Sequence, residues 1–159
     1  MAERMPMTPA GYLKVVTELK RYKSVERPQN IIALEEARAH GDLSENAEYD
    51  AAKDRQSHIE GRIIDLEAKV GLAEVIDIAT IPASERVIFG TTVEVEDDDT
   101  GESLKYRIVG MEEADVKKGL ISYSSPIGRA LLGKNVGDEA RFDTPKGSRS
   151  LTIKAVHYR

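Results

Sequence analysis

The sequence predicts an α+β protein in which a long antiparallel helical hairpin precedes an antiparallel sheet with one short helix. Two observations predict this fold class. Up to about residue 74, apolar residues recur every three or four positions, as on one face of a helix. Beyond residues 78–82 this period stops, and short runs rich in β-branched residues follow. We therefore divide the 159 residues into an antiparallel coiled-coil domain, 1–78, with an acidic tip at 41–49, and an α+β domain, 79–159.

The first helix is predicted to begin at Thr8 and Pro9, because threonine is a good N-cap and proline suits the first helical position. A one-sided apolar stripe then follows at helical spacing: Tyr12, Val15 (or Val16), Leu19 and Tyr22. Pro28 interrupts this stripe, because proline lacks a backbone donor and the residue before it resists helix. We expect a kink there, with the helix resuming through Ala37.

The junction between the two helical patterns predicts the tip of the hairpin. Gly41 can adopt a left-handed conformation at low cost and would end the first helix. Asp42 is a good N-cap for the second helix, and Glu45 can return the capping bond. This second helix is predicted from about Leu43 to Glu74. Its apolar residues follow the 4-3-4-3 spacing of a coiled-coil seam: Ile59, Ile63, Leu66, Val70 and Ala73.

The tip carries more acid than helix capping requires. Asp42 and Glu45 are joined by further carboxylates close in sequence: Glu35, Glu36, Glu48 and Asp50. Grouped carboxylates supply the oxygen ligands of a hard cation such as Mg²⁺, which also keeps water and phosphate ligands. Two are too few to hold the metal alone, so the tip would lend ligands to a site on another molecule. A junction built only from one glycine and one capping box remains the alternative.

Basic residues along the helices allow two interpretations. They could line a nucleic-acid backbone, or they could be solvated surface with acidic partners one turn away. We favour the surface interpretation for most of them: Lys20, Arg21, Lys23, Arg27, Arg55 and Arg62. Arg38 and Lys53 are the exceptions, because they flank the acidic tip.

In the second domain, β-rich runs predict strands near residues 87–89, 92–95, 106–109, 120–123, 136–142 and 151–156. Asp97–Glu102 predicts a polar hairpin turn, because its run of aspartates lacks the ligand spacing of an EF-hand. One short helix is predicted after Ser125, its N-cap, with Pro126 at the first position. It runs through Leu132 and is ended by Gly133.

Composition and motif searches exclude several classes of function. The chain has no cysteine, which rules out disulfides, thiol catalysis and cysteine-ligated zinc. It has no apolar run long enough to span a membrane and no apolar core of a secretory signal, which predicts a cytoplasmic protein. The net charge of −5 argues against a general duplex-DNA binder. Zinc-ligand spacing, a nucleophile elbow and a phosphate-binding loop are also missing, so the sequence encodes no self-contained active site.

Two motifs resemble those of the Gre family of bacterial transcript cleavage factors. Residues 41–49, Gly-Asp-Leu-Ser-Glu-Asn-Ala-Glu-Tyr, with the Ala-Ala-Lys that ends at Lys53, are similar to the tip of that family. Residues 125–134, Ser-Pro-Ile-Gly-Arg-Ala-Leu-Leu-Gly-Lys, followed by Val-Gly-Asp at 136–138, are similar to its C-terminal signature. Their order, their separation and the total length fit the family over essentially the whole chain. The lack of an extensive basic patch on the helices fits its GreA type.

The resemblance implies an elongation factor that acts on bacterial RNA polymerase. In the family, the coiled coil enters the secondary channel, and the tip supports Mg²⁺-dependent endonucleolytic cleavage of the 3′ end of backtracked nascent RNA. Asp42 and Glu45 correspond to the acidic pair that helps to hold the second Mg²⁺, shared with the polymerase. Arg38 and Lys53 are expected to contact the RNA or its phosphates. The protein would be an accessory factor and not an enzyme by itself.

The resemblance also implies a C-terminal domain that is FKBP-like, similar in fold to the FK506-binding prolyl isomerases. In the family, this domain docks on the β′ subunit at the rim of the channel. Ser125, Pro126, Ile127 and Arg129 correspond to the docking surface. Helix capping and core packing are the alternative role of Pro126 and Ile127. We expect a monomer with no membrane partner.

Other functions stay open at this point. A Gre-like protein could block the channel and inhibit the polymerase, since Glu48 and Asp50 could alter metal binding at the tip. The C-terminal domain could be a prolyl isomerase, although it has few of the aromatic residues that such a pocket needs and no Trp. A structural coiled-coil adaptor is a further alternative.

Overall fold

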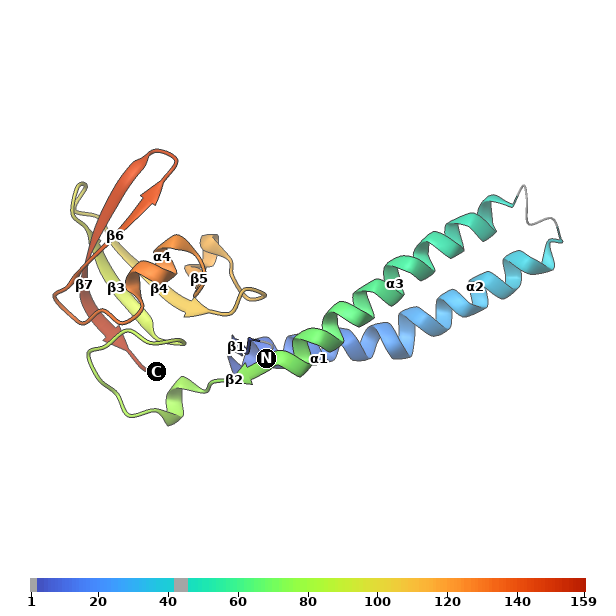
Figure 1. The fold of residues 1–159 in the computed structure, drawn as a ribbon, viewed down its shortest axis with the longest axis horizontal. Helices are drawn as coiled ribbons and strands as arrows, with labels where there is room; N and C mark the ends of the chain where they lie inside the picture. The colour runs from blue at the N-terminus through green and yellow to red at the C-terminus, as the bar shows by residue number, and fades with distance from the viewer. Residues whose placement is uncertain (1–2, 42–45) are drawn as a thin grey trace. The chain divides into compact units, whose positions relative to one another are not determined.

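A computed structural model describes residues 3–41 and 46–159. By their contacts the described residues form two compact units, one within residues 12–73 together with residue 3, and one made of residues 4–11 and 74–159. The predicted fold class is confirmed: a long helical hairpin is followed by a curled sheet with a short helix (Figure 1). The domain boundary after residue 78 stays a prediction. No helix among the described residues is both long and apolar enough to cross a membrane.

The first unit is built from the helices of the hairpin. Over the described residues, its helical segments in chain order are α1 (Pro9–Arg21), η1 (Tyr22–Glu26), α2 (Arg27–Ala39) and α3 (Ala47–Leu72). Helices α2 and α3 run back along each other (Figure 1). Their facing side chains are buried, and they include the middle of the predicted seam: Leu34, Ala37, Ala52, Ile59, Ile63 and Leu66. Burial of this apolar stripe is the main term that holds a helix pair together.

The interruption predicted at Pro28 is present as the π-helical turn η1. The backbone N–H of Arg27 bonds to the carbonyl of Tyr22, five residues back. An α-helical proline would drive its ring into the carbonyl four residues earlier, at Ser24, and would leave that carbonyl without a donor. A wider turn just before the proline relieves this collision while the backbone stays helical. The proline therefore changes the pitch of the helix instead of ending it.

Ion pairs join the two sides of the hairpin. The Arg27 guanidinium donates two hydrogen bonds to the Glu60 carboxylate, at 2.9 and 2.7 Å. Comparable pairs follow along the helices: Lys23 with Glu67, Arg55 with Glu26, and Arg62 with Glu18. Each of these cations is paired with an acid across its own hairpin, which agrees with the surface interpretation, although that interpretation stays a prediction. Exposed pairs of this kind add little stability each, but they favour one alignment of the helices.

The second unit contains a five-stranded sheet among the described residues, in the order β5-β4-β3-β7-β6 (Figure 1). Its strands are β3 (Thr92–Asp97), β4 (Ser103–Val109), β5 (Leu120–Ser122), β6 (Glu139–Thr144) and β7 (Gly147–His157). The pairings are antiparallel except that β5 runs parallel to β4, which corrects the prediction of a wholly antiparallel sheet. The physical reason is a crossover: residues 110–119, with the short helix η3 (Val116–Lys118), carry the chain back before β5 begins.

A second correction concerns the run Val87–Phe89, which is predicted as a strand but forms none. Both end residues of the run are buried in the core. The backbone of Val87 bonds instead to the segment after helix α4 (Pro126–Leu131), through Lys134 O at 2.8 Å and Gly133 N at 2.9 Å. The apolar and β-branched residues of this run are therefore explained by burial in the core, and they do not indicate a strand of the sheet.

The core of the second unit lies between the sheet and α4, which packs against β5 and β6. Its centre consists of fully buried aliphatic side chains: Val93, Val95, Ile108, Leu131, Leu151 and Ile153. Val93 and Val95 on β3, like Leu151 and Ile153 on β7, alternate with half-exposed residues, as expected for a sheet with one buried face. Phe89 and Tyr123 add an edge-to-face aromatic pair with ring centroids 6.1 Å apart.

The start of α1 belongs to this second unit, where the carboxylate of Glu113 holds it. Strand β1 (Met5–Met7) pairs with β2 (Ala73–Val75) and leads directly into Thr8. The Glu113 carboxylate accepts hydrogen bonds from the Thr8 hydroxyl, from Thr8 N at 3.3 Å and from Gly110 N at 3.1 Å. The Thr8 hydroxyl also accepts from Gly11 N at 3.1 Å, so the predicted N-cap is confirmed.

Candidate functional site

The end of α2 has the geometry that the sequence predicts. The backbone N–H of Gly41 bonds to the Arg38 carbonyl at 3.0 Å, and that of His40 to the Ala37 carbonyl at 3.2 Å. Gly41 has a φ of 89°, so its predicted left-handed conformation is confirmed. Asp42 and Glu45 lie outside the described residues, and their metal-binding role stays a prediction.

Helix α3 begins later than predicted, and its N-cap is Asn46 instead of Asp42. The Asn46 side-chain oxygen accepts from Tyr49 N at 3.0 Å, while its amide nitrogen donates to the Ala37 carbonyl at 2.6 Å. One buried side chain therefore satisfies a free donor of α3 and gives the Ala37 carbonyl of α2 a second donor beside His40 N. A carboxylate could make only the first of these bonds, because it has no donor. This double role explains why the cap falls at the asparagine.

The described charges of the tip flank the segment between α2 and α3. Arg38 is exposed, and its side chain makes no hydrogen bond or ion pair with any described residue. Lys53 is exposed and donates to the Gln56 side chain at 3.1 Å. His40 Nδ1 lies 3.2 Å from Glu48 Oε2, which joins the two sides of the tip once more. Within residues 3–41 and 46–159, no group of three or more acidic or histidine side chains is arranged to hold a metal ion.

The C-terminal signature forms the short helix α4 as predicted. The Ser125 hydroxyl accepts from Gly128 N at 3.0 Å and donates to the Ser122 carbonyl at 2.7 Å, so its N-cap role is confirmed. Pro126 occupies the first turn, and Gly133, with a φ of 83°, follows the helix end. A Cβ on Gly128 would lie 2.1 Å from the Ser122 carbonyl oxygen, so only glycine fits there. Part of the signature is therefore explained by local packing alone.

The predicted docking residues divide into two kinds. Pro126 and Arg129 are exposed and free to meet a partner. Ser125 is half-buried and occupied by its cap, and Ile127 packs against the core cluster. The structural role is confirmed for Ile127 and Ser125, whereas a docking role of these residues stays a prediction.

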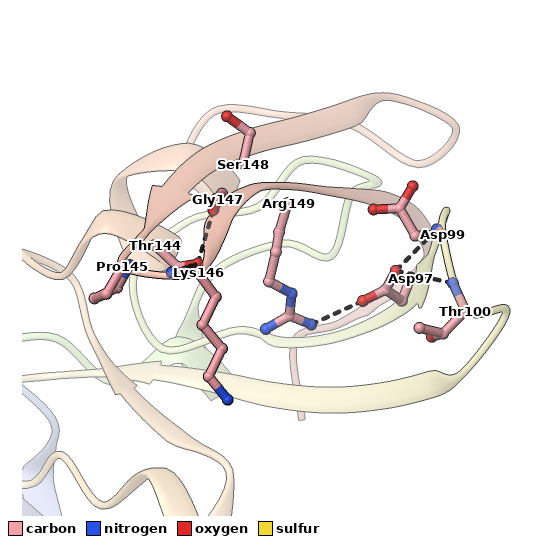
Figure 2. Close-up of a pocket in the computed structure, with 9 residues that line it drawn as sticks. All are labelled: Asp97, Asp99, Thr100, Thr144, Pro145, Lys146, Gly147, Ser148 and Arg149. Carbon is pink, nitrogen blue, oxygen red and sulfur yellow. Dashed lines mark hydrogen bonds and ion pairs between the residues drawn. The ribbon is translucent and has the colours of Figure 1, made fainter.

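A pocket of about 480 Å³ lies between the β3–β4 and β6–β7 turns, and Figure 2 shows the side chains that line it. Asp97 accepts from Asp99 N at 2.9 Å, from Thr100 N at 3.2 Å and from Arg149 Nη2 at 3.0 Å. The Asp99 N–H and then the Arg149 guanidinium lower the pKa of Asp97 below its ordinary value. The Asp97 carboxylate thus stabilises the turn between β3 and β4, and the predicted polar turn is confirmed.

Both parts of the chain match known protein families. Residues 5–75 match the family model described as transcription elongation factor, N-terminal, and residues 82–158 match the one described as transcription elongation factor, GreA/GreB, C-term. The chain is 52% identical over 155 residues to transcription elongation factor GreA of Verminephrobacter eiseniae, covering 98% of both chains. It is 54% identical over 157 residues to that of Hyphomonas neptunium, covering 99% of both.

Solved structures of similar sequence also exist. The structure of the transcription factor Gfh1 is 35% identical, covers 99% of both chains and has a TM-score of 0.45. A GreA/GreB elongation factor from Nitrosomonas europaea is 22% identical, with a TM-score of 0.43, over 99% of this chain and 100% of that one. The family assignment rests on the two matched models and on the identity to the GreA proteins. The chain belongs to the GreA/GreB family of transcription elongation factors.

Proposed function

We propose that the protein binds bacterial RNA polymerase through its secondary channel and stimulates cleavage of the 3′ end of backtracked RNA. Membership of an elongation-factor family supports this proposal. The observation that carries it is the tip: a paired helical hairpin whose ends are joined by Asn46 and whose connecting segment contains Asp42 and Glu45. Such a factor works in the cytoplasm, where bacterial transcription takes place.

Asp42 and Glu45 are the residues that we assign to the shared Mg²⁺. Two carboxylates supply oxygen ligands that suit this ion, and they leave most of its coordination to the polymerase, the RNA and water. When bound, a second Mg²⁺ can activate a water molecule and stabilise the leaving oxygen in phosphodiester hydrolysis. The contribution of this chain is to raise the occupancy of that ion and to accept hydrogen bonds from the attacking water. The chemistry remains that of the polymerase.

Arg38 and Lys53 have different prospects as RNA contacts. Arg38 is exposed and its guanidinium is not used by any described residue, so it can donate to an RNA phosphate without breaking an existing bond. Lys53 must first exchange its bond to Gln56, although that bond is exposed and weak. We therefore assign the larger contribution to Arg38.

The C-terminal unit would dock on the β′ subunit at the rim of the channel through Pro126 and Arg129. These two residues are exposed and lie one helical turn apart, which places them on the same face of α4. Ser125 and Ile127 would contribute by holding the helix in place.

The test is RNA cleavage in a stalled, backtracked elongation complex with Mg²⁺. Wild type is expected to shorten the RNA from its 3′ end. Asp42→Asn should bind the polymerase equally well and cleave at least about tenfold more slowly, as expected when one metal ligand is lost. Glu48→Gln is the matched control, because Glu48 is a neighbouring tip carboxylate that pairs with His40, and it should retain most activity.

Two outcomes would overturn the proposal. If wild type binds without stimulating cleavage and slows nucleotide addition, the protein is a channel-blocking inhibitor. If Asp42→Asn cleaves as fast as wild type, the Asp42 carboxylate does not hold the metal and the assigned role of the tip fails.

A further inference from the structure

A basic pocket lies between α4 and β6 in the second unit. It has a volume of about 440 Å³, and its described lining consists of Arg129, Ala130, Leu132, Lys134, Glu139 and Arg141. Three cations and one carboxylate among these residues contrast with the net charge of −5 of the whole chain. We call this site the basic pocket.

The cations of the basic pocket are not used by the fold. Arg129 and Lys134 make no hydrogen bond or ion pair through their side chains with any described residue. Arg141 reaches Glu139 only at 3.4 Å, with side chains that are 79% and 55% exposed. The paired cations of the hairpin, such as Arg27, lie 2.6–2.9 Å from their carboxylates. The basic pocket thus keeps positive charge available for another molecule.

The backbone under these side chains is well fixed. Arg129 N bonds to Ser125 O at 2.9 Å within α4, and Lys134 N bonds to Leu131 O at 3.1 Å. Lys134 O accepts from Val87 N at 2.8 Å, while Arg141 pairs with Ser150 in the sheet. Cations on fixed backbone lose less freedom when they bind, because only their side chains must be ordered.

Helix-end electrostatics do not account for the whole cluster. Cations are favoured at the C-terminus of a helix, which explains Arg129 and Lys134. Arg141 lies on a strand, and α4 has only six residues, so its dipole is short. A further guanidinium, that of Arg86, lies beside Gly133, where an added Cβ would be 3.7 Å from Arg86 Nη2. The nearby carboxylate of Asp138 is turned onto a backbone amide, that of Asn135, at 2.9 Å.

We propose that the basic pocket binds a carboxylate-bearing segment of the polymerase surface on which the C-terminal unit docks. Arg129, Lys134 and Arg141 pair with its Asp or Glu side chains, and exposed Pro126, one turn before Arg129, adds an apolar contact beside them. This inference rests on the proposed function and names the chemistry of the partner at that docking surface. A planar guanidinium can donate two parallel hydrogen bonds to one carboxylate. Such a pair fixes the orientation of the two groups as well as attracting them.

An acidic protein segment fits the basic pocket better than a nucleic-acid backbone does. Phosphates are spaced regularly along a strand and need a track of cations to give useful affinity. Here three cations line one hollow together with two apolar residues, Ala130 and Leu132, which suits a side chain with a stem and a charged end. The acidic balance of the chain as a whole would repel a long polyanion.

The first test identifies the chemical group that meets Lys134. A water-soluble carbodiimide activates a carboxylate; the Lys134 amine then attacks the activated carbon, an amide forms, and the carboxylate oxygen leaves with the reagent as its urea. In the complex of the full chain with RNA polymerase, mass spectrometry should find Lys134 joined to an Asp or Glu of the polymerase. Lys134→Arg keeps the charge without a reactive primary amine, and should bind equally while giving no such product. Lys154 is the internal control, because it is paired with Glu96 of the same chain and should give no product with the polymerase.

The second test measures affinity for the polymerase by fluorescence anisotropy of the labelled chain. The double variant Arg129→Glu/Arg141→Glu should raise Kd at least about tenfold, because close charge pairs in an interface are strongly coupled. Lys117→Glu/Lys118→Glu, on the exposed helix η3, makes the same change in net charge and should alter Kd less than about twofold. Circular dichroism of each variant checks that the fold is retained.

The outcomes separate this inference from the proposed function. If wild type does not bind the polymerase, the proposed function fails and this inference fails with it. If wild type binds and cleaves while the double variant binds equally well, only the basic pocket inference is overturned. It is also overturned if the double variant loses affinity for an RNA oligonucleotide instead of for the polymerase, since the ligand is then phosphate.

Discussion

Removal of the Glu113 carboxylate should measurably destabilise the second unit. In Glu113→Ala, the Thr8 N–H, the Gly110 N–H and the Thr8 hydroxyl proton all lose their acceptor. Thr8 is only 2% exposed, so water reaches these donors poorly. A buried donor left unpaired costs roughly 1–3 kcal/mol. Because Glu113 itself is half-buried and some water will enter, we expect a total loss of about 2–4 kcal/mol in the free energy of unfolding.

The assay is urea denaturation at neutral pH, followed by circular dichroism, with a double-mutant cycle to isolate the contact. Thr8→Val removes the hydroxyl and the cap at nearly constant volume and should cost about 1–2 kcal/mol. In the double variant Thr8→Val/Glu113→Ala, the loss should be smaller than the sum of the single losses by roughly 1 kcal/mol or more. Additive losses would refute the reasoning, because they would mean that the two groups do not stabilise each other.

Gly11 offers an independent check of the same contact. A Cβ at this position would lie 2.2 Å from Glu113 Cδ, so Gly11→Ala should displace the carboxylate and destabilise the wild-type protein. In the Glu113→Ala background the space is free, and the same substitution should stabilise by about 0.5–1 kcal/mol, the usual gain of alanine over glycine in a helix. The sign of the effect therefore depends on residue 113.

Three further outcomes follow from the structure. Asn46→Asp keeps the acceptor for Tyr49 but loses the donor to Ala37, so thermal melts should show a loss of roughly 1 kcal/mol, against about 2 kcal/mol for Asn46→Ala, which loses both bonds. An unchanged stability of Asn46→Asp would mean that the bond to Ala37 adds nothing. Gly128→Ala should cost more than about 2 kcal/mol in urea denaturation, because its Cβ would meet backbone at 2.1 Å and α4 would have to shift. Arg27 lowers the pKa of Glu60 from 4.5 chiefly by its hydrogen bonds, so the stabilising contribution of this pair is complete above pH 4.5 and is lost as pH falls through the lowered value. Melting temperatures measured between pH 3 and pH 6 should fall on the acid side, and Arg27→Gln should reduce that dependence; an unchanged slope would exclude the pair as its source.

Local signals in the sequence sufficed for much of the fold. Apolar periodicity predicts the hairpin, because one face of each helix must be buried in the other. Gly41, Ser125 and Gly133 are predicted correctly because caps and left-handed turns depend on a few adjacent residues.

Non-local contacts decide the features that the sequence could not predict. Asp42 and Asn46 are both good caps, but only the asparagine amide can also donate to the Ala37 carbonyl, nine residues earlier. Glu113 holds Thr8 across 105 residues, a distance that no local pattern reports. Val87 likewise bonds to a segment almost fifty residues later, which takes it out of the sheet.

The candidate site shows the same division. The carboxylates of the tip can be recognised from their residue types and spacing, as can the capping residues of α4. The basic pocket was not predicted, because Arg129, Lys134 and Arg141 come from a helix, the segment after it and a strand. No periodicity connects these positions before the chain has folded. In the sequence, the positive charge of these residues is also offset by acidic residues that lie elsewhere in the structure, so no basic run marks the pocket.

The bridge made by Asn46 separates the stability of the hairpin from the composition of its tip. Because this side chain joins the last turn of α2 to the first turn of α3, the segment between them begins and ends at anchored points. The entropic cost of closing the segment then depends on its length between the two fixed ends, and only weakly on which residues it contains. Substitutions between these anchors are therefore expected to leave the bonds that Asn46 makes to both helices in place. A single amide thus makes the tip a replaceable module, free to be tuned for a partner's chemistry while the hairpin keeps its stability.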